Sequence, residues 1–203
     1  MRRKIITTSD GSKTIQIEDW NEQYHSVHGA VQEARHVFLK HGLEHYCLNW
    51  KAIHSNSELK DKASIDILEI GFGTGLNAFL TLIESEKLEP KINYVGVEAY
   101  PVEQKEINAL NYVEMISDQH QIEFNQLHEV SWAEPHDITP KFKLEKQQKL
   151  FSQIKAHEAF DLIYFDAFGA RVQPELWTVA IFSLMYNALR QHGVLVTYSA
   201  KGS

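Results

Sequence analysis

The sequence contains one cysteine, Cys47, and this scarcity excludes two kinds of stabilising site within a single chain. A disulfide needs two thiols, and cysteine-based zinc sites need several cysteine ligands. Long apolar runs are also missing, since no stretch approaches the roughly 18 consecutive apolar residues of a membrane-spanning helix. The N-terminal stretch lacks the apolar segment of a signal peptide. We therefore expect a cytoplasmic protein without membrane association.

Positive charge is scarce as well. The 203 residues include 20 lysines and arginines against 27 acids, which gives a formal net charge of −7 at pH 7. This balance excludes a uniformly basic surface for binding phosphates, although it leaves a local basic patch possible. The hydrophobic fraction of 43% is typical of one globular core. We expect one compact domain overall, with an N-terminal hairpin and helix in residues 1–62 and the main core in residues 63–203.

The N-terminal part begins with two short alternating runs around Asp10 and Gly11. They predict a β-hairpin, because both residues accept the backbone angles of tight turns. Residues 22–50 then place apolar side chains at helical spacing, which predicts one long helix or two helices broken near Gly42. A polar linker from about residue 55 to residue 63 is expected to follow.

From Ile65 onward, short apolar runs alternate with longer amphipathic stretches. The runs are rich in β-branched or aromatic residues, as buried parallel strands are, and span 65–70, 92–98, 159–168 and 193–199. The stretches long enough for helices span 75–88, 102–116 and 173–192. This order predicts an α/β fold with a parallel sheet and right-handed crossovers.

Two regions of the core depart from this regular alternation. From about Ile122 to Lys155 we expect a strand, a hairpin-like excursion at 142–146 and a short helix. The sequence also stops immediately after the last expected strand. Because an open sheet that ends there leaves a bare edge, we expect a C-terminal helix and further strands to be missing from this sequence.

The stretch ILEIGFGTGLNAF, residues 67–79, joins an expected strand to an expected helix through a glycine-rich turn. Dinucleotide-binding turns follow G-x-G-x-x-G and seat a pyrophosphate on the helix N-terminus. Here the spacing is G-x-G-x-G, with Glu69 two residues before the first glycine. A carboxylate at this place repels a pyrophosphate and can pair with a cationic amino acid. The turn therefore favours S-adenosyl-L-methionine, which carries an ammonium and a sulfonium, over NAD; a tight turn without ligand is the alternative.

Acids also stand at the ends of two later strands. Glu98 ends the second strand of the core, where nucleotide-binding α/β folds place an acid on the ribose hydroxyls. A solvated strand-end glutamate is the alternative interpretation. At the end of the next loop Lys149 stands where an acid could contact adenine, so adenine recognition stays unassigned.

Asp166 and Phe168 follow the strand that carries FDLIYF, at the expected carboxyl edge of the sheet. Ligands of open α/β sheets bind at this edge. An aspartate there can orient an amine and accept its proton, and a phenyl ring can pack against a planar group. Methyl transfer needs mainly a neutral nucleophile that is close and aligned. We expect Asp166 and Phe168 to be the catalytic residues, and Asp161 to be a strand-entry charge.

Several motifs together resemble one family, the methyltransferase domain of the bifunctional tRNA-modifying enzyme MnmC. These motifs are YHSVHGAVQEARHVFL, ILEIGFGTGLNAFL, DLIYFDAF, QPELWT and VLVTYSAKG, which run in order from Tyr24 to Gly202. The resemblance implies a Rossmann-like class I fold that binds S-adenosyl-L-methionine. It also implies methyl transfer to the exocyclic amine of 5-aminomethyl-2-thiouridine at the wobble position of tRNA.

The family's functional residues can be carried onto this sequence position by position. The resemblance implies that the methionine part of the cofactor is surrounded by Glu69, Gly71, Gly73, Thr74, Gly75 and Asn77. Glu98 would contact the ribose, and Asp166 would be the catalytic acceptor with Phe168 beside it. A lid over the cofactor would be formed by Tyr24, Ser26, Gly29 and Glu33. The alternative for these four residues is a capped, amphipathic surface helix.

The sequence departs from the family in three places. The flavin-dependent oxidase domain is absent from it, so a separate oxidase would have to unmask the substrate amine. After Asp166-Ala167-Phe168 the family tends to have Ala-Pro, whereas this sequence has Gly169-Ala170-Arg171. The basic C-terminal stretch with its K-R-E-M signature is also missing.

Other functions stay open at the level of sequence. An aminopropyltransferase resembling spermidine synthase would need a second aspartate soon after Asp166, and Arg171 would repel its polyamine substrate. A small-molecule N-methyltransferase and a non-catalytic cofactor-binding protein are further alternatives. The histidine pairs at 25/28 and 41/45 have a spacing that suits metal ligands, but no acid or cysteine completes either set. We expect no metal site.

Overall fold

The computed structural model describes residues 2–49 and 63–198. The linker expected at residues 55–63 therefore lies outside the described residues, except for Ala63. Near the N-terminus a small antiparallel sheet consists of β1 (Arg3–Thr7), β2 (Lys13–Ile17) and β3 (Glu22–Gln23). The predicted hairpin turn at Asp10 and Gly11 joins β1 to β2, and the short 3-10 helix η1 (Glu18–Trp20) precedes β3.

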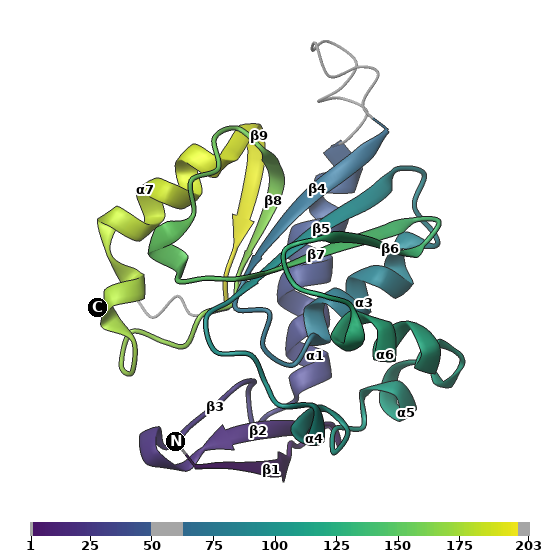
Figure 1. Ribbon diagram of the computed structural model, residues 1–203, viewed down its shortest axis with the longest axis vertical. Helices are drawn as coiled ribbons and strands as arrows, with labels where there is room; N and C mark the ends of the chain where they lie inside the picture. The colour runs from purple at the N-terminus through teal and green to yellow at the C-terminus, as the bar shows by residue number, and fades with distance from the viewer. Residues whose placement is uncertain (1, 50–62, 199–203) are drawn as a thin grey trace.

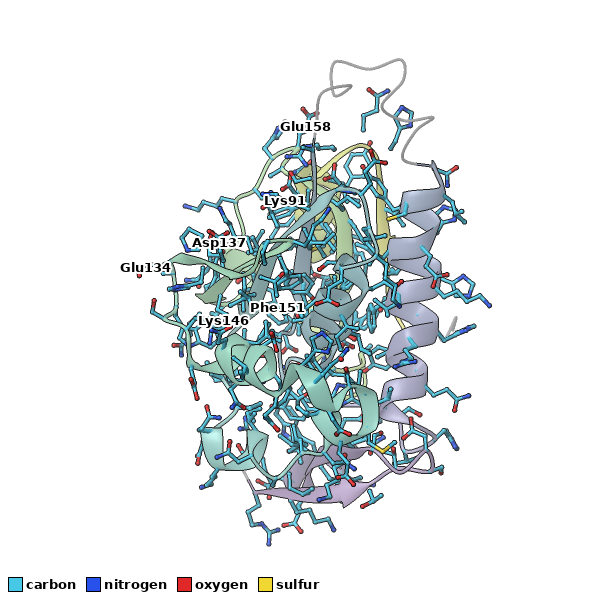
Figure 2. All side chains as sticks on the ribbon, turned by 90° about the vertical axis from the view of Figure 1, so that its right-hand side faces the viewer. Lys91, Glu134, Asp137, Lys146, Phe151 and Glu158 are labelled. Atoms are coloured by element: carbon cyan, nitrogen blue, oxygen red, sulfur yellow. The ribbon has the colours of Figure 1, made fainter. Side chains whose placement is uncertain are left out.

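One continuous helical stretch follows the small sheet. It comprises α1 (Ala30–Ala34), the π-helical η2 (Arg35–Glu44) and further helical residues up to Asn49. The break considered near Gly42 does not occur. A Cβ at Gly42 would come within 3.1 Å of both Tyr164 and Val196, so glycine lets the helix lie close to the large sheet. Figure 2 shows this helix running along one side of the molecule.

The large sheet has six strands in the order β6-β7-β5-β4-β8-β9. Their bounds are β4 (Ser64–Ile70), β5 (Lys91–Glu98), β6 (Pro135–Thr139), β7 (Phe142–Gln148), β8 (Phe160–Phe165) and β9 (Leu189–Val196). All neighbours are parallel except β6, which is antiparallel to β7. The predicted α/β fold with a parallel sheet is confirmed.

The region from Ile122 to Lys155 differs from the sequence-based expectation. The helix α6 (Gln121–Glu129) replaces the expected strand, because Phe124 and Leu127 bury the same face at helical spacing. The residues expected in a hairpin-like excursion do form a hairpin, because β7 pairs antiparallel with β6, but β7 also pairs with β5 inside the large sheet. Lys146 of β7, labelled in Figure 2, is 1% exposed and donates to the carbonyl of His128 at 2.7 Å. This bond holds the C-terminal end of α6 against the sheet.

The other helices are shorter than predicted, including α3 (Leu76–Ser85), which begins at the expected place and ends three residues before Leu88. Where one helix was expected at 102–116, the chain forms α4 (Gln104–Ile107) and α5 (Tyr112–Ile116), followed by η3 (Asp118–His120). Asn111 interrupts them because its side chain accepts from Lys13 N and donates to the carbonyl of Gly11 in the hairpin. The helix expected at 173–192 is η5 (Pro174–Trp177) followed by α7 (Val179–Ala188), and Leu189 already begins β9.

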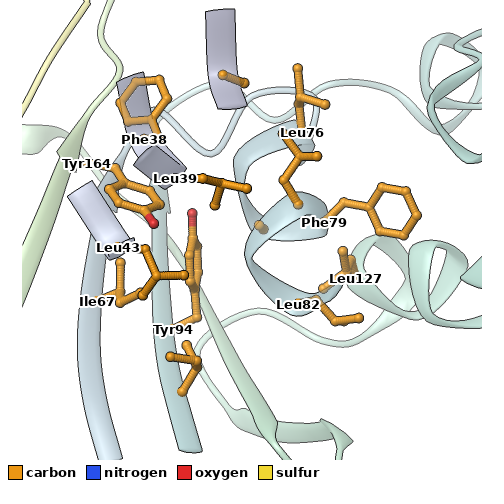
Figure 3. Close-up of a cluster of buried hydrophobic side chains, with 14 of the residues drawn as sticks. Phe38, Leu39, Leu43, Ile67, Leu76, Phe79, Leu82, Tyr94, Leu127 and Tyr164 are labelled. Atoms are coloured by element: carbon orange, nitrogen blue, oxygen red, sulfur yellow. The ribbon is translucent and has the colours of Figure 1, made fainter. Parts of the chain in front are cut away.

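Helices cover both faces of the large sheet. On one face η2, α3 and α6 pack on a cluster that includes Ile67, Tyr94 and Tyr164. Figure 3 shows these side chains between η2 and α3. On the other face α7 and the short 3-10 helix η4 (Phe151–Gln153) pack on the alternate strand residues, such as Leu68 and Phe165. None of the helices in the described ranges has the length and apolar character that crossing a bilayer requires.

The strand order places a ligand crevice at one edge of the sheet. The chain leaves β4 toward β5 on one side and later enters β8 on the other side, so the connections diverge at the carboxyl end of β4. Crevices of open α/β sheets form at such a switch point. In Figure 1 the small sheet of β1, β2 and β3 lies beyond this carboxyl edge, so residues near the N-terminus face the glycine turn.

Candidate active site

A cavity of about 330 Å³ lies at the carboxyl edge of the large sheet, between the glycine turn and the small sheet. Its volume is in the range of small-molecule sites. The predicted site residues that line it are Tyr24, Gly71, Gly73, Thr74, Asn77, Glu98, Asp166 and Phe168. Five predicted residues do not line it, and these are Ser26, Gly29, Glu33, Glu69 and Gly75.

The glycine turn crosses directly over the end of β8. Gly71 has a φ of 89°, and a Cβ at this position would lie 2.5 Å from the carbonyl oxygen of Asp166. The N–H groups of Gly71 and Phe72 donate to the carbonyl of Val97 on β5. A side chain at position 71 would therefore push the turn away from Asp166. The turn needs glycine here both for its backbone angle and for this close approach.

Two carboxylates meet at one amide at the base of the cavity. The Nδ2 group of Asn77 donates to Glu69 Oε1 at 3.0 Å and to Asp166 Oδ2 at 2.7 Å. Glu69 is 1% exposed and Asn77 is 2% exposed, and both are held by the junction of β4 and α3. The glutamate therefore lies behind the cavity wall and acts on its contents through Asn77 and through its charge.

The electrostatics of this pair favour a cationic ligand. The pKa of Asp166 is raised to about 7, chiefly by burial; the hydrogen bond from Asn77 opposes this rise, and the charge of Glu33 adds to it. Burial and the charge of Asp166 together raise the pKa of Glu69 well above its ordinary value. Within the described ranges, no lysine or arginine forms an ion pair with either acid. An ammonium or sulfonium entering the cavity would supply the missing positive charge and restore ionisation.

A buried oxygen at the base of the cavity also lacks a hydrogen-bond donor among the described residues. Asn77 Oδ1 is buried and has no hydrogen-bond partner in the described part of the chain. Leaving a buried acceptor unsatisfied is costly, so such atoms in native sites often face a ligand. An ammonium group offers up to three N–H donors. The residues at the base of the cavity thus fit the amino-acid end of S-adenosyl-L-methionine.

Glu98 stands at the opposite end of the glycine turn. Its Oε2 accepts from Gly73 N at 3.0 Å, and its Oε1 accepts from Tyr100 N at 2.9 Å. These bonds fix the carboxylate at the cavity wall, while each oxygen retains a lone pair for another donor. Such an acid can accept a hydrogen bond from a ribose hydroxyl, and ribose binding by Glu98 stays a prediction.

Of the four residues predicted to form a lid, one lines the cavity and the other three lie at the start of α1. Tyr24 lines the cavity and lies against the glycine turn, since a Cβ at Gly73 would come within 3.1 Å of its ring. Ser26, Gly29 and Glu33 instead organise the turn into α1: the Ser26 N–H donates to Glu33 Oε1 at 3.3 Å, and the Gly29 N–H donates to the Ser26 carbonyl. Glu33 acts on the cavity through its charge near Asp166. The lid role stays a prediction for these residues.

Sequence reasoning missed a large share of the cavity wall. The additional residues include Arg3, Trp20, His25, Leu150, Phe151, Ser152, Gln173, Glu175 and Tyr198. Leu150 to Ser152 follow β7 and lie beside Glu98, because the Lys149 N–H donates to the Glu98 carbonyl at 3.2 Å. At the level of sequence this loop is considered for adenine contact at Lys149, where an acid is sought, and these three residues are not singled out.

His25 is enclosed between the small sheet and the glycine turn. Its Nδ1 lies 2.8 Å from Thr14 Oγ1, and its Nε2 lies 3.5 Å from Thr74 Oγ1. Burial lowers its pKa to about 4, so the ring is neutral at pH 7. No group of three or more potential metal ligands occurs in residues 2–49 and 63–198. His25 therefore connects Thr74 of the predicted cofactor site to the small sheet as a neutral hydrogen-bonding group.

Comparisons with known proteins agree with this geometry. Residues 108–203 match a family model described as S-adenosyl-L-methionine-dependent methyltransferase. A bifunctional protein of Ralstonia nicotianae named for tRNA 5-methylaminomethyl-2-thiouridine biosynthesis, MnmC, is 26% identical over 91% of this chain and 28% of its own length. The uncharacterized protein MJ0670 of Methanocaldococcus jannaschii is 21% identical over 97% of this chain and 50% of its own length.

The crystal structure of MNMC2 from Aquifex aeolicus superposes with a TM-score of 0.67 at 21% sequence identity. The match covers 98% of this chain and 60% of that chain, so the likeness extends over the whole described fold. The chain thus spans about a quarter to a half of the two curated relatives. The comparisons confirm the resemblance to MnmC-like methyltransferases and the expected cofactor, S-adenosyl-L-methionine, and they support an S-adenosyl-L-methionine-dependent methyltransferase.

Proposed function

We propose that this chain methylates the 5-aminomethyl group of 5-aminomethyl-2-thiouridine at the wobble position of tRNA. The relatives named for biosynthesis of this nucleoside support the substrate, and they match over most of this chain. The observation that carries the proposal is the pair of Asp166 and Asn77 at the base of a cavity that also holds the glycine turn. An acid with a pKa near 7 suits proton removal from an amine at physiological pH.

The chain's own residues would perform three tasks. Asn77 would bind the ammonium of the cofactor, the charge of Glu69 behind it would attract this ammonium, and Glu98 would bind the ribose. Leu150, Phe151 and Ser152 lie beside Glu98, where the adenine ring would extend. Tyr24 would close over the glycine turn, as the lid interpretation expects. These contacts would hold the cofactor's methyl group toward Asp166.

Bound S-adenosyl-L-methionine supplies an electrophilic methyl carbon on its sulfonium. Asp166 would orient the incoming amine so that its lone pair faces this carbon. Asp166 would also accept the proton that the amine releases when it is methylated. Asn77 keeps the carboxylate in place through its 2.7 Å bond. Orientation of this kind accounts for most of the catalysis that a methyl transfer requires.

The proposal includes partners that lie beyond the catalytic cavity. The substrate would be tRNA, and an oxidase would expose its aminomethyl group before methyl transfer. The cytoplasm, where tRNA is modified, is the compartment in which we expect the protein to act.

The decisive experiment supplies labelled S-adenosyl-L-methionine and tRNA that carries 5-aminomethyl-2-thiouridine, followed by nucleoside analysis. Label in 5-methylaminomethyl-2-thiouridine is the expected result. The matched control is the same tRNA with an unmodified wobble uridine, which should remain unlabelled. Absence of label, with cofactor binding confirmed by calorimetry, would contradict the proposed substrate and favour a small-molecule amine or a non-catalytic role.

A further inference from the structure

Three aromatic rings form a continuous series along the cavity. The Tyr24 ring lies at the glycine turn and meets Phe168 edge-to-face, with ring centroids 5.0 Å apart and an interplanar angle of 78°. Phe168 in turn meets Trp20 edge-to-face at 5.7 Å and 84°. All three residues line the cavity. The series therefore begins at the predicted cofactor site, passes the ring next to Asp166 and ends at Trp20.

The position of Trp20 is fixed by a residue from the opposite end of the chain. Both terminal nitrogens of Arg171 lie 3.3 Å from the Trp20 carbonyl oxygen, and one of them also donates to the Asn21 carbonyl at 3.1 Å. The same guanidinium pairs with Glu22 at 2.8 Å. One planar group thus holds three consecutive residues, from the end of η1 to the start of β3. Arg171 belongs to the loop that follows Phe168, so it joins the two walls of the cavity opening.

The residues around this opening suit a flat, polar molecule. Trp20 and Phe168 are partly exposed. Gln173 and Glu175, which follow Asp166 in the chain, line the same cavity. An indole offers a broad apolar face to a heterocycle, while an amide and a carboxylate can hydrogen-bond to its edge. An aliphatic amine would use only the carboxylates. The opening therefore has the composition expected for a nucleobase.

We propose that Trp20 is the stacking platform for a planar nucleobase acceptor and that Arg171 is its positioning residue. The inference rests on the proposed function, and it narrows the acceptor to an aminomethyl group carried by a flat ring. Stacking of one base on an aromatic side chain contributes roughly 1–3 kcal/mol, which corresponds to about 5-fold to 150-fold in affinity. Arg171 contributes indirectly, because it keeps the backbone that carries the indole in place.

The first test measures binding of two amines to the protein saturated with S-adenosylhomocysteine, by calorimetry. One amine is 5-aminomethyluridine, and the other is cyclohexylmethylamine, which has the same aminomethyl group on a non-planar ring. We expect the protein to bind the nucleoside at least about 10-fold more tightly. Trp20→Leu should abolish this preference, whereas Trp20→Phe should retain most of it. Equal affinity for the two amines, absence of binding by both, or a preference that survives in Trp20→Leu would overturn the inference.

A second test examines Arg171. In Arg171→Met we expect the KM for the acceptor tRNA to rise about 5-fold, while the KM for S-adenosyl-L-methionine stays within 2-fold. The matched control is Lys87→Met, which removes an exposed ion pair of the same 2.8 Å length at the end of α3 and should change neither constant. If both constants rise together, Arg171 supports the fold and does not position Trp20.

The two proposals fail in different ways. A chain that transfers no methyl group to tRNA but prefers 5-aminomethyluridine through Trp20 would contradict the proposed tRNA substrate and leave the stacking platform intact. A chain that methylates tRNA with the same KM in Trp20→Leu would uphold the proposed function and refute the platform.

Discussion

The strands β4 and β8 each carry acids near both of their ends. The acids at the two ends of the strands have different partners. At the amino ends, Asp66 and Asp161 share Arg190, whose Nη1 lies 2.8 Å and 3.1 Å from their carboxylates. At the carboxyl ends, Glu69 and Asp166 share only the neutral amide of Asn77. Both pairs belong to the same two strands, yet among the residues that the structure describes only the amino-end pair has a lysine or arginine as partner.

The difference separates structure from function within one sheet. Asp161 is 1% exposed, and its other oxygen accepts a hydrogen bond from Asp66 N at 2.7 Å. Groups of the same chain therefore satisfy its hydrogen bonds and balance its charge. The carboxyl-end pair has an elevated pKa and an oxygen of Asn77 without a donor, which a cationic ligand would remedy. Buried acids alone do not identify a site, but buried acids without a cation do indicate one.

The largest effect should follow from removing the acid at the carboxyl end. In Asp166→Ala we expect turnover to fall about 1,000-fold, or about 4 kcal/mol, because the proton acceptor is lost. Affinity for S-adenosyl-L-methionine should remain within a few-fold, since Glu69 and Glu98 are unchanged. Single-turnover methyl transfer and calorimetry measure the two quantities. Collapse of cofactor binding would instead assign Asp166 to the cofactor site.

Removing the cation at the amino end should lower the stability of the protein. Arg190→Met leaves two carboxylates without their cation, and we expect the free energy of unfolding to fall by about 3 kcal/mol. Denaturant titration followed by circular dichroism measures the change. Lys143→Met removes an exposed ion pair with Asp137 and serves as the matched control, with a change below about 0.5 kcal/mol. A similar loss in both variants would mean that the amino-end cluster is not special.

Removing a charge at the carboxyl end should raise the free energy of unfolding instead of lowering it. Because the pKa of Asp166 is raised to about 7, the folded protein without ligand carries an unfavourable charge above that pH, while the unfolded chain ionises near pH 4. The wild-type chain therefore loses stability between about pH 4 and pH 7. Asp166→Asn should be more stable by about 2 kcal/mol at pH 8, a figure reduced for water in the cavity, and equal to wild type below pH 4. Unfolding curves across this range check the sign, and a less stable variant at pH 8 would refute it.

The smallest expected effect concerns the acid behind the wall. Glu69→Gln keeps the shape and a hydrogen bond to Asn77 but removes the charge that faces the cofactor's ammonium. We expect affinity for S-adenosyl-L-methionine to fall about 10-fold, or about 1.4 kcal/mol. Glu84→Gln, at a partly exposed position of α3 outside the cavity, should leave the affinity unchanged. Unaltered binding in Glu69→Gln would show that the ammonium is held elsewhere.

Sequence reasoning reached the residues whose role depends on local pattern. The turn at Gly71 to Gly75 and the strand ends at Glu98 and Asp166 were predictable, because glycine spacing and apolar runs are short-range signals. Trp20 and Arg171 were not, since their contact depends on how the small sheet lies against the large one. Interpreting Ile122 as the start of a strand also concealed α6, and the hairpin expected at 142–146 was not recognised as part of the large sheet. A residue that contributes to a site only through tertiary contacts leaves no local sequence pattern from which its role can be predicted.

The bond between Arg171 and the Trp20 carbonyl joins residues 151 positions apart, and this has a consequence for synthesis. At roughly 10 residues per second on a ribosome, the small sheet would wait about 15 s before the loop that anchors it is made. During that interval the aromatic series is incomplete and the cavity has only one wall. A nascent chain would thus bind neither cofactor nor acceptor until β8 and its following loop emerge, so activity would appear only as translation nears this sequence's last strand.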